Sequence, residues 1–301
     1  MTKKTPRSDI YQTVTSRIIA ELEEGRVPWV QPWGRDAAAS AALPKNAISE
    51  RAYSGVNILI LWGEAIAHHY PSQVWMTFRQ AKNLGGSVRK GEHGAQIVYA
   101  DRFTPKAERE RAAESGDAPK TIPFLKAFTV FNVAQCDGLP DSVTAAPAPL
   151  PECGAIPRAE SLIASTGADI RIGGDKACYN PSADYISLPP QPTFFEQINY
   201  YRTAFHELGH WTGHESRLDR TFHGRYGSRP YAREELVAEM TSAFVCASLA
   251  ISPTVRHADY IGSWLALLKD DKKAIFNAAS LASKASDFLL SHRPDQALRA
   301  A

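Results

Sequence analysis

The amino-acid sequence predicts an α+β fold in two parts: an N-terminal α+β domain and a C-terminal, mostly helical domain with a small β-sheet. In the first half, helical periodicity gives way to two runs rich in β-branched and aromatic residues. Residues 139–157 contain five prolines among small residues and show neither helical nor strand periodicity, which is typical of a semi-rigid linker. The pattern after them is largely helical. We therefore assign residues 1–138 and 158–301 to the two domains and residues 139–157 to the linker.

The first expected helix begins near Ser8, a favourable N-cap, and ends at Gly25. Between these positions Val14, Ile18 and Leu22 recur at intervals of four. Residues at this spacing share one face of a helix, so we expect an amphipathic helix packed on a core.

The rest of the N-terminal domain combines helices with one hairpin. We expect one helix over residues 56–68 and a shorter one over residues 77–85. Residues 96–103 and 122–133 are predicted to be paired strands because they are rich in β-branched and aromatic side chains. Residues 104–121 carry charges of both signs, which predicts a solvated, briefly helical excursion of this hairpin.

The C-terminal domain is expected to begin with one helix and two short strands and to continue with longer helices. No internal repeat is visible. The expected elements are a helix over 158–165, strands over 169–172 and 184–188, and helices over 193–213, 232–250, 254–270 and a tail through 290.

Composition excludes several classes of protein. The chain has 301 residues, 44% of them hydrophobic, and no run approaches the roughly 20 apolar residues of a membrane span. Its first residues lead into an amphipathic pattern and not into an apolar signal core, so we expect a cytoplasmic protein with no membrane partner. A net charge of +2 is too small to predict a nucleic-acid partner by itself. No C-x-x-C pair occurs among the cysteines, so neither a disulfide framework nor a thiolate zinc site is indicated; they are Cys136, Cys153, Cys178 and Cys246.

The most specific motif is His206-Glu207-Leu208-Gly209-His210. On a helix, residues four apart lie on one face, so His206 and His210 are placed to bind one cation through their imidazoles. Zinc in such a site lowers the pKa of a bound water molecule, and Glu207 would take its proton and later return one to a leaving amine. The alternative is a surface helix with two hydrogen-bonded histidines. Apolar residues along one side of the helix favour the metal site.

Zinc hydrolases usually add a third protein ligand to two such histidines. The pattern H-E-x-x-H-x-x-G-x-x-H is excluded because Ser216 occupies its last position, and His214 lies one helical turn farther from the metal. A later helix offers Glu235 and Glu239, which share a face. By analogy with thermolysin-like sites, we assign Glu235 as the ligand and Glu239 as the carboxylate that orients a histidine; the reverse order is the alternative. Zn²⁺ suits this set best, with Mn²⁺ or Ni²⁺ as alternatives.

Two other features of a zinc peptidase are suggested by position alone. The strand over residues 184–188 precedes the motif helix, where such enzymes keep an edge strand that pairs with an extended peptide. Tyr226 or Tyr231 is a candidate donor to an oxyanion, and a structural role is the alternative for each.

The N-terminal half contains a candidate nucleic-acid surface. Residues 77–94 combine cations with glycines, which let backbone amides approach a phosphate closely. Aromatic residues upstream lie in loop-like contexts and are candidate platforms for unpaired bases. The alternative is a solvated basic turn with tryptophans filling a small core. The candidate DNA contacts are Trp29, Trp33, Arg51, Tyr53, Arg79, Lys82, Arg89 and Lys90.

Five separated motifs resemble those of ArdC-type antirestriction proteins and their plasmid primase relatives. They are residues 51–57, 75–91 and 128–139 in the first half, and 206–220 and 231–240 in the second. This resemblance spans nearly the whole chain. It implies an N-terminal domain that binds single-stranded DNA, a C-terminal zincin-like domain, and a plasmid-encoded protein that shields incoming DNA from restriction during conjugation. It carries over directly to His206, Glu207 and His210.

Three functions remain open at this point. The chain is expected to be a DNA-binding antirestriction factor. It is alternatively an active zinc metallopeptidase that cleaves a host protein such as a restriction enzyme subunit. A zinc-stabilised interaction module without turnover is the third alternative.

Overall fold

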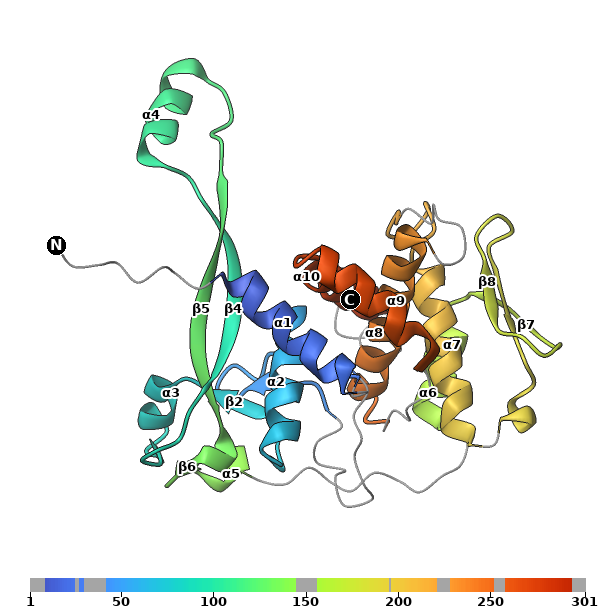
Figure 1. Cartoon of the computed structure of the whole chain (residues 1–301), viewed down its shortest axis with the longest axis horizontal. Helices are drawn as coiled ribbons and strands as arrows, with labels where there is room; N and C mark the ends of the chain where they lie inside the picture. Colours follow the sequence, from blue (N-terminus) through green and yellow to red (C-terminus); the bar gives the residue numbers. More distant parts are fainter. Residues whose placement is uncertain are drawn as a thin grey trace.

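The computed structural model describes residues 9–24, 27–29, 42–144, 156–194, 196–220, 228–251 and 258–293. It has the mixed helix and strand architecture that the sequence predicts. Strands gather in the N-terminal half and long helices in the C-terminal half (Figure 1). Among the described residues, no helix is long and apolar enough to cross a membrane.

The first helix, α1 (Ile10–Glu23), buries Ile18 and Leu22 as expected. Its N-cap differs from the prediction. Asp9, and not Ser8, caps the helix, because its carboxylate accepts hydrogen bonds from the amide of Tyr11 at 3.1 Å and of Gln12 at 3.4 Å.

A four-stranded sheet in the order β1-β2-β5-β4 forms the centre of the N-terminal half. Strand β1 pairs in parallel with β2, and the other pairs are antiparallel. A smaller sheet pairs β3 with β6. The elements are β1 (Lys45–Asn46), α2 (Val56–Ala67), β2 (Val74–Met76), α3 (Phe78–Asn83), β3 (Ser87–Val88), β4 (Ala95–Phe103), α4 (Lys106–Ser115), β5 (Ile122–Asn132), a 3-10 turn (Val133–Gln135) and β6 (Cys136–Asp137).

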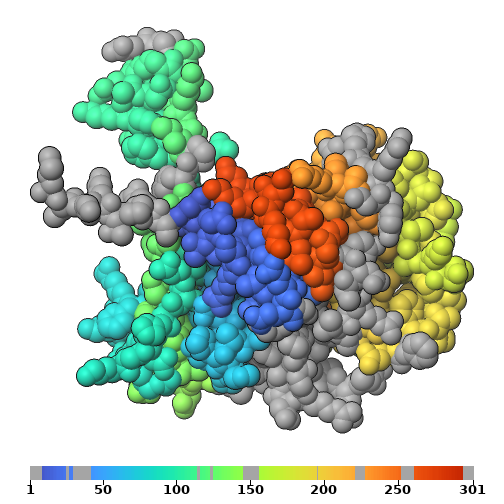
Figure 2. Space-filling model, in the orientation of Figure 1, coloured from blue at the N-terminus to red at the C-terminus, as the bar shows by residue number. Residues whose placement is uncertain are grey.

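The β4–β5 hairpin extends well beyond the body of the molecule (Figures 1 and 2). Its register runs without interruption from the Ala95–Val130 pair to the Phe103–Ile122 pair. Helix α4 lies at its tip, which confirms the predicted helical excursion.

The stretch assigned to the linker contains one helical turn, α5 (Asp141–Thr144), which the sequence did not predict. Residues 145–155 lie outside the described part of the chain. Helix α6 (Pro157–Ser165) follows and begins at Pro157, which suits the first position of a helix.

The C-terminal half is a small sheet beside a set of helices. Strand β9 lies between β7, to which it is parallel, and β8, to which it is antiparallel. The expected edge strand over residues 184–188 is therefore central, and the open edges belong to β7 and β8. The elements are β7 (Asp169–Ile172), β8 (Cys178–Asn180), β9 (Tyr185–Leu188), a 3-10 turn (Gln191–Thr193), α7 (Gln197–Trp211), α8 (Arg229–Ser248), α9 (Ala258–Asp270) and α10 (Ala274–Ser291).

One hydrophobic core joins the two halves of the chain. Side chains of α1 and α2 pack with those of α8, α9 and α10. The rings of Trp62 and Phe244 lie 5.8 Å apart, and those of Trp29 and Trp264 lie 5.2 Å apart, each pair edge to face. A second core lies between α7, α8 and β9 and holds the motif helix in place.

Candidate metal centre

Helices α7 and α8 approach each other closely at Gly209, inside the sequence motif. A Cβ atom at this position would lie 3.1 Å from the Cα of Ala238 and 3.3 Å from the Cβ of Thr241. The glycine therefore lets the backbones come together. This close approach brings Glu235 of α8 opposite His206 and His210 of α7.

Three potential ligand side chains converge between the two helices. The Nε2 atoms of His206 and His210 are 3.2 Å apart; that of His206 lies 3.5 Å from Glu235 Oε2, and that of His210 lies 3.5 Å from Glu235 Oε1. Tetrahedral ligands about 2.0–2.1 Å from a zinc ion are separated by about 3.3 Å. The spacing and the donor atoms therefore fit a divalent cation with two imidazole ligands and one carboxylate.

The opposite nitrogen of each imidazole faces a second carboxylate. His206 Nδ1 lies 3.1 Å from Glu239 Oε1, and His210 Nδ1 lies 3.3 Å from Glu234 Oε1. An imidazole that donates from Nδ1 keeps Nε2 unprotonated and directed at the metal. Glu235 thus faces the Nε2 atoms of both rings, and Glu239 faces Nδ1 of His206.

Each of these outer carboxylates is held by a buried arginine. Arg202 Nη2 donates to Glu239 Oε2 at 3.0 Å. Arg220 donates to both oxygens of Glu234, at 2.8 Å from Nη2 and 3.2 Å from Nε. The site therefore contains two parallel His–Glu–Arg chains, one behind each imidazole.

Arg220 also closes the end of the motif helix. Its guanidinium donates to the carbonyl of Gly209 at 2.6 Å and to the hydroxyl of Thr212 at 2.8 Å. The last carbonyls of a helix lack intrahelical donors, so this contact satisfies one of them. The same side chain thus fixes the helix that carries the histidines and the carboxylate that orients His210.

Glu234, Arg202 and Arg220 were not predicted as site residues from the sequence. A signal existed for Arg202, which lies four residues before His206 and so on the same helical face. Arg220 offered none, because it reaches the site only through the turn after α7, where its amide donates to the carbonyl of Gly213 at 2.8 Å.

The other motif residues take different positions. Glu207 is only 7% exposed and lies on α7 between the two histidines in sequence. His214 bonds to Ser216, with 2.8 Å between Nδ1 and the hydroxyl oxygen, and is not part of the cluster. Tyr231 lies in the first turn of α8, and Tyr226 is outside the described residues.

Carboxylates dominate the electrostatics of the cluster. Burial lowers the pKa of His210, but hydrogen bonds with Glu234 and Glu235 outweigh it and raise the pKa to about 9. Burial also lowers the pKa of His206, but its neighbours Glu235 and Glu239 outweigh burial and raise this pKa well above its ordinary value. Burial raises the pKa of Glu235, yet the two histidines bring it far below the usual range. The cluster thus favours positive charge at its centre, as a cation site requires.

Comparisons with known proteins agree with this architecture. A model of the N-terminal domain of anti-restriction factor ArdC matches residues 8–131, and a zincin-like metallopeptidase model matches residues 157–281. The metal-free crystal structure of antirestriction ArdC protein from the R388 plasmid is 43% identical, with a TM-score of 0.80 over 95% of this chain and 98% of that one. This chain belongs to the ArdC antirestriction family.

Other relatives extend this picture of the ArdC family. The Mn(II)-bound structure of the R388 protein is 42% identical, with a TM-score of 0.78 over 95% of this chain and 99% of that one. An uncharacterized protein of Sinorhizobium fredii, y4eC, is 43% identical over 98% of this chain and 96% of its own length. Two DNA primases TraC of Escherichia coli are 36% and 38% identical over 97% and 96% of this chain, which spans only 20% and 28% of their length.

The expected DNA contacts of the N-terminal half differ in their burial and in their partners. Trp29 is fully buried against Trp264, so its prediction as a base platform is wrong. Tyr53 is half-buried and packs on a core cluster with Trp75. Arg89 is engaged by Glu92, by Asp137 and by the carbonyl of Ala134. Trp33 lies outside the described residues.

The remaining candidates, Arg51, Arg79, Lys82 and Lys90, are exposed. Within the described part of the chain, no carboxylate forms an ion pair with any of them. These four cations therefore stay available to a phosphate backbone.

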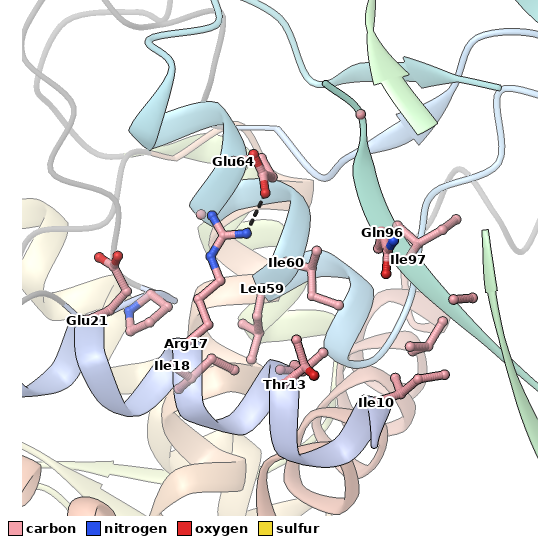
Figure 3. Close-up of a pocket in the computed structure, with 16 residues that line it drawn as sticks. Ile10, Thr13, Arg17, Ile18, Glu21, Leu59, Ile60, Glu64, Gln96 and Ile97 are labelled. Carbon is pink, nitrogen blue, oxygen red and sulfur yellow. Dashed lines mark hydrogen bonds and ion pairs between the residues drawn. The ribbon is translucent and has the colours of Figure 1, made fainter. Parts of the chain in front are cut away.

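The N-terminal half also contains a cavity of about 250 Å³ between α1, α2 and β4 (Figure 3). Its wall is mainly aliphatic, with Ile18, Leu59 and Ile97 among the lining residues. The ion pair between Arg17 and Glu64 bridges the two helices beside it. None of the residues of the candidate metal centre lines this cavity.

Proposed function

We propose that this ArdC-family chain binds single-stranded DNA in the cytoplasm and protects incoming plasmid DNA from host restriction during conjugation. Its C-terminal half acts as a metal-dependent, peptidase-like domain. The observation that carries the proposal is the convergence of His206, His210 and Glu235 in a chain related over nearly its whole length to an antirestriction protein.

We propose that these three side chains hold Zn²⁺, with Mn²⁺ or Ni²⁺ as alternatives. The separations of 3.2 Å and 3.5 Å between the donor atoms support this, because they match the edges of a tetrahedral site. The Mn(II)-bound state of the R388 relative also supports a divalent ion. Glu239 and Glu234 would hold the two imidazoles with Nε2 directed at the ion.

A bound divalent cation supplies Lewis-acid activation of water and of a carbonyl. Glu207, which is buried beside the two proposed ligands, would accept the proton of the attacking water and deliver it to the leaving amine. His206 and His210 act as fixed ligands here, because the carboxylates behind them hold each ring. This division of roles makes Glu207 the residue to change without disturbing the metal.

A plasmid-transfer assay tests the antirestriction function. Unmodified plasmid DNA is moved by conjugation into a restricting host that expresses the wild-type chain, the Glu207→Gln variant or the control Glu215→Gln, which alters an exposed glutamate near the motif. We expect the wild type and the control to raise the yield of transconjugants over an empty vector. An unchanged yield with the wild type would contradict the function.

The same assay decides whether peptide hydrolysis contributes. If the Glu207→Gln variant still protects the plasmid, protection is assigned to DNA binding alone. Loss of protection with Glu207→Gln, and not with Glu215→Gln, favours the second candidate function, an active metallopeptidase that cleaves a host protein such as a restriction enzyme subunit. The position of Glu207 between two proposed ligands favours this candidate.

Proteomic comparison of restricting cells that express wild type or Glu207→Gln identifies the substrate. Depletion of one host protein by the wild type alone would establish cleavage. If no protein is depleted and chelation merely unfolds the C-terminal half, the site is a zinc-stabilised interaction module.

A further inference from the structure

A phenylalanine is exposed at the start of α3, within the segment whose cations and glycines predict a nucleic-acid surface. Phe78 is 48% exposed, although a large apolar side chain gains free energy from burial. The ammonium group of Lys82 lies over the ring, 5.4 Å from its centroid, and the centroid of the Phe131 ring lies 6.4 Å away in an edge-to-face arrangement. The ring is thus contacted by one cation and one aromatic neighbour, and about half of the side chain stays exposed.

A neighbouring loop is fixed against the same helix. The side chains of Asn46 and Gln80 hydrogen-bond to each other at 3.2 Å and 3.3 Å, and Asn46 also accepts from the amide of Ile48 at 3.1 Å. Thr77 and Gln80 form a capping box that fixes the start of α3. Ile48, itself 48% exposed, is therefore held beside the helix that carries Phe78.

Three exposed cations lie on this surface. Arg51 follows the same loop, and Arg79 and Lys82 lie on α3; all three are exposed and lack an ion pair with any described carboxylate. Arg89, by contrast, is neutralised by Glu92 and Asp137. Figure 1 places α3 at the opposite end of the molecule from α7 and the candidate metal centre.

We propose that Phe78 is the platform on which an unpaired base of single-stranded DNA stacks, with Arg51, Arg79 and Lys82 binding the adjacent phosphates. Exposed aromatic rings beside cations are the usual combination for single strands. A duplex does not fit, because its base faces are already stacked on each other. The inference rests on the proposed single-strand binding and names the surface responsible for it.

The chain offers a matched control on the β4–β5 hairpin. Phe128 is 39% exposed, and the ammonium of Lys126 lies 5.0 Å from its ring centroid. The local pairing of ring and ammonium is the same as at Phe78, but Phe128 lies opposite Ile97 on the hairpin, outside α3 and the loop that leads to Arg51. Phe128→Ala therefore removes an exposed ring with the same cation contact from outside the proposed surface.

The test measures binding of the full-length chain to a fluorescein-labelled oligodeoxythymidine by anisotropy over a range of salt concentrations. We expect Phe78→Ala to weaken binding roughly 5- to 150-fold with an unchanged salt dependence, because stacking is lost and no cation is removed. Arg79→Gln should instead reduce the slope of log K against log salt by about 0.7. Phe78→Leu should bind as weakly as Phe78→Ala, because it keeps apolar volume but has no aromatic face.

The outcomes separate this inference from the proposed function. No binding by the wild type at low salt overturns both. Three results would overturn the stacking platform alone while the wild type still binds. They are unchanged binding by Phe78→Ala, an equal loss of binding in Phe128→Ala, and full binding by Phe78→Leu. Unchanged thermal unfolding of each variant shows that an effect on binding is local.

Discussion

His206 Nδ1 lies 3.1 Å from Glu239 Oε1, on the side of the imidazole away from Glu235. Because Glu239 is in turn held by Arg202, the ring has a fixed orientation before any metal arrives. Orienting carboxylates of this kind typically account for a 10- to 100-fold difference in metal affinity. The metal affinity of the site therefore depends on residues that do not touch the metal.

Removing the charge of Glu239 should weaken metal binding. We expect Glu239→Gln to lower zinc affinity about 10- to 100-fold, because the amide holds the Nδ1 proton of His206 less strongly and leaves Arg202 without its charged partner. Competition with a fluorescent chelator measures the affinity. Wild-type affinity in this variant would show that the His–Glu–Arg chain does not position the ligand.

The second chain should behave in the same way. Glu234→Gln is expected to lower zinc affinity by about 10- to 100-fold through His210, because Glu234 stands behind that ring as Glu239 stands behind His206. The same chelator competition applies, with the exposed-site variant Glu215→Gln as control. An affinity equal to that of the control would restrict the positioning effect to His206.

A side chain at position 209 should destabilise the protein. Gly209→Ala places a Cβ 3.1 Å from the backbone of Ala238, so α7 and α8 must separate, and we expect a loss of about 1–3 kcal/mol in the free energy of unfolding. Denaturant titration measures it. The control is Gly262→Ala, since nothing lies within 4 Å of a Cβ there. Equal stability of the two variants would contradict the close helix contact.

Metal loading should release protons. In the metal-free protein the pKa of His210 is raised to about 9, so at pH 7.5 the ring is mostly protonated and must lose its proton to bind a metal. Zinc affinity should therefore rise as the pH increases towards 9. Calorimetry in buffers of different ionisation enthalpy measures the protons released, and a heat independent of the buffer would contradict the prediction.

The raised pKa of His210 also determines how the stability of the metal-free protein changes with pH. A histidine whose pKa is raised on folding contributes stability that is fully present below its ordinary value of 6.5 and is lost as the pH rises through about 9. We expect chelator-treated protein to unfold at lower denaturant concentration at pH 9.5 than at pH 6.5. The difference should shrink in His210→Gln, which removes this titrating ring.

Residues linked by helical periodicity could be predicted from the sequence. His206 and His210, like Glu235 and Glu239, are four apart, so their shared faces follow from local geometry. Arg220 could not, because its place depends on the path of the chain after α7.

Trp29 shows the same limit in the N-terminal half. It lies in a sequence context typical of a loop, yet its partner Trp264 comes from α9, more than two hundred residues later. Local sequence carries no information about that contact. Strand β8 (Cys178–Asn180) escaped prediction for a related reason, since so short a strand forms only through its pairing with β9.

The central claim is that His206, His210 and Glu235 together hold a divalent metal. The most direct test is a crystal structure of the zinc-loaded protein with data collected at the zinc absorption edge. The account predicts one anomalous peak about 2.0–2.2 Å from both Nε2 atoms and from the Glu235 carboxylate, with Glu239 still on His206 Nδ1. A peak bound by Glu239 in place of Glu235, or no peak between α7 and α8, would contradict it.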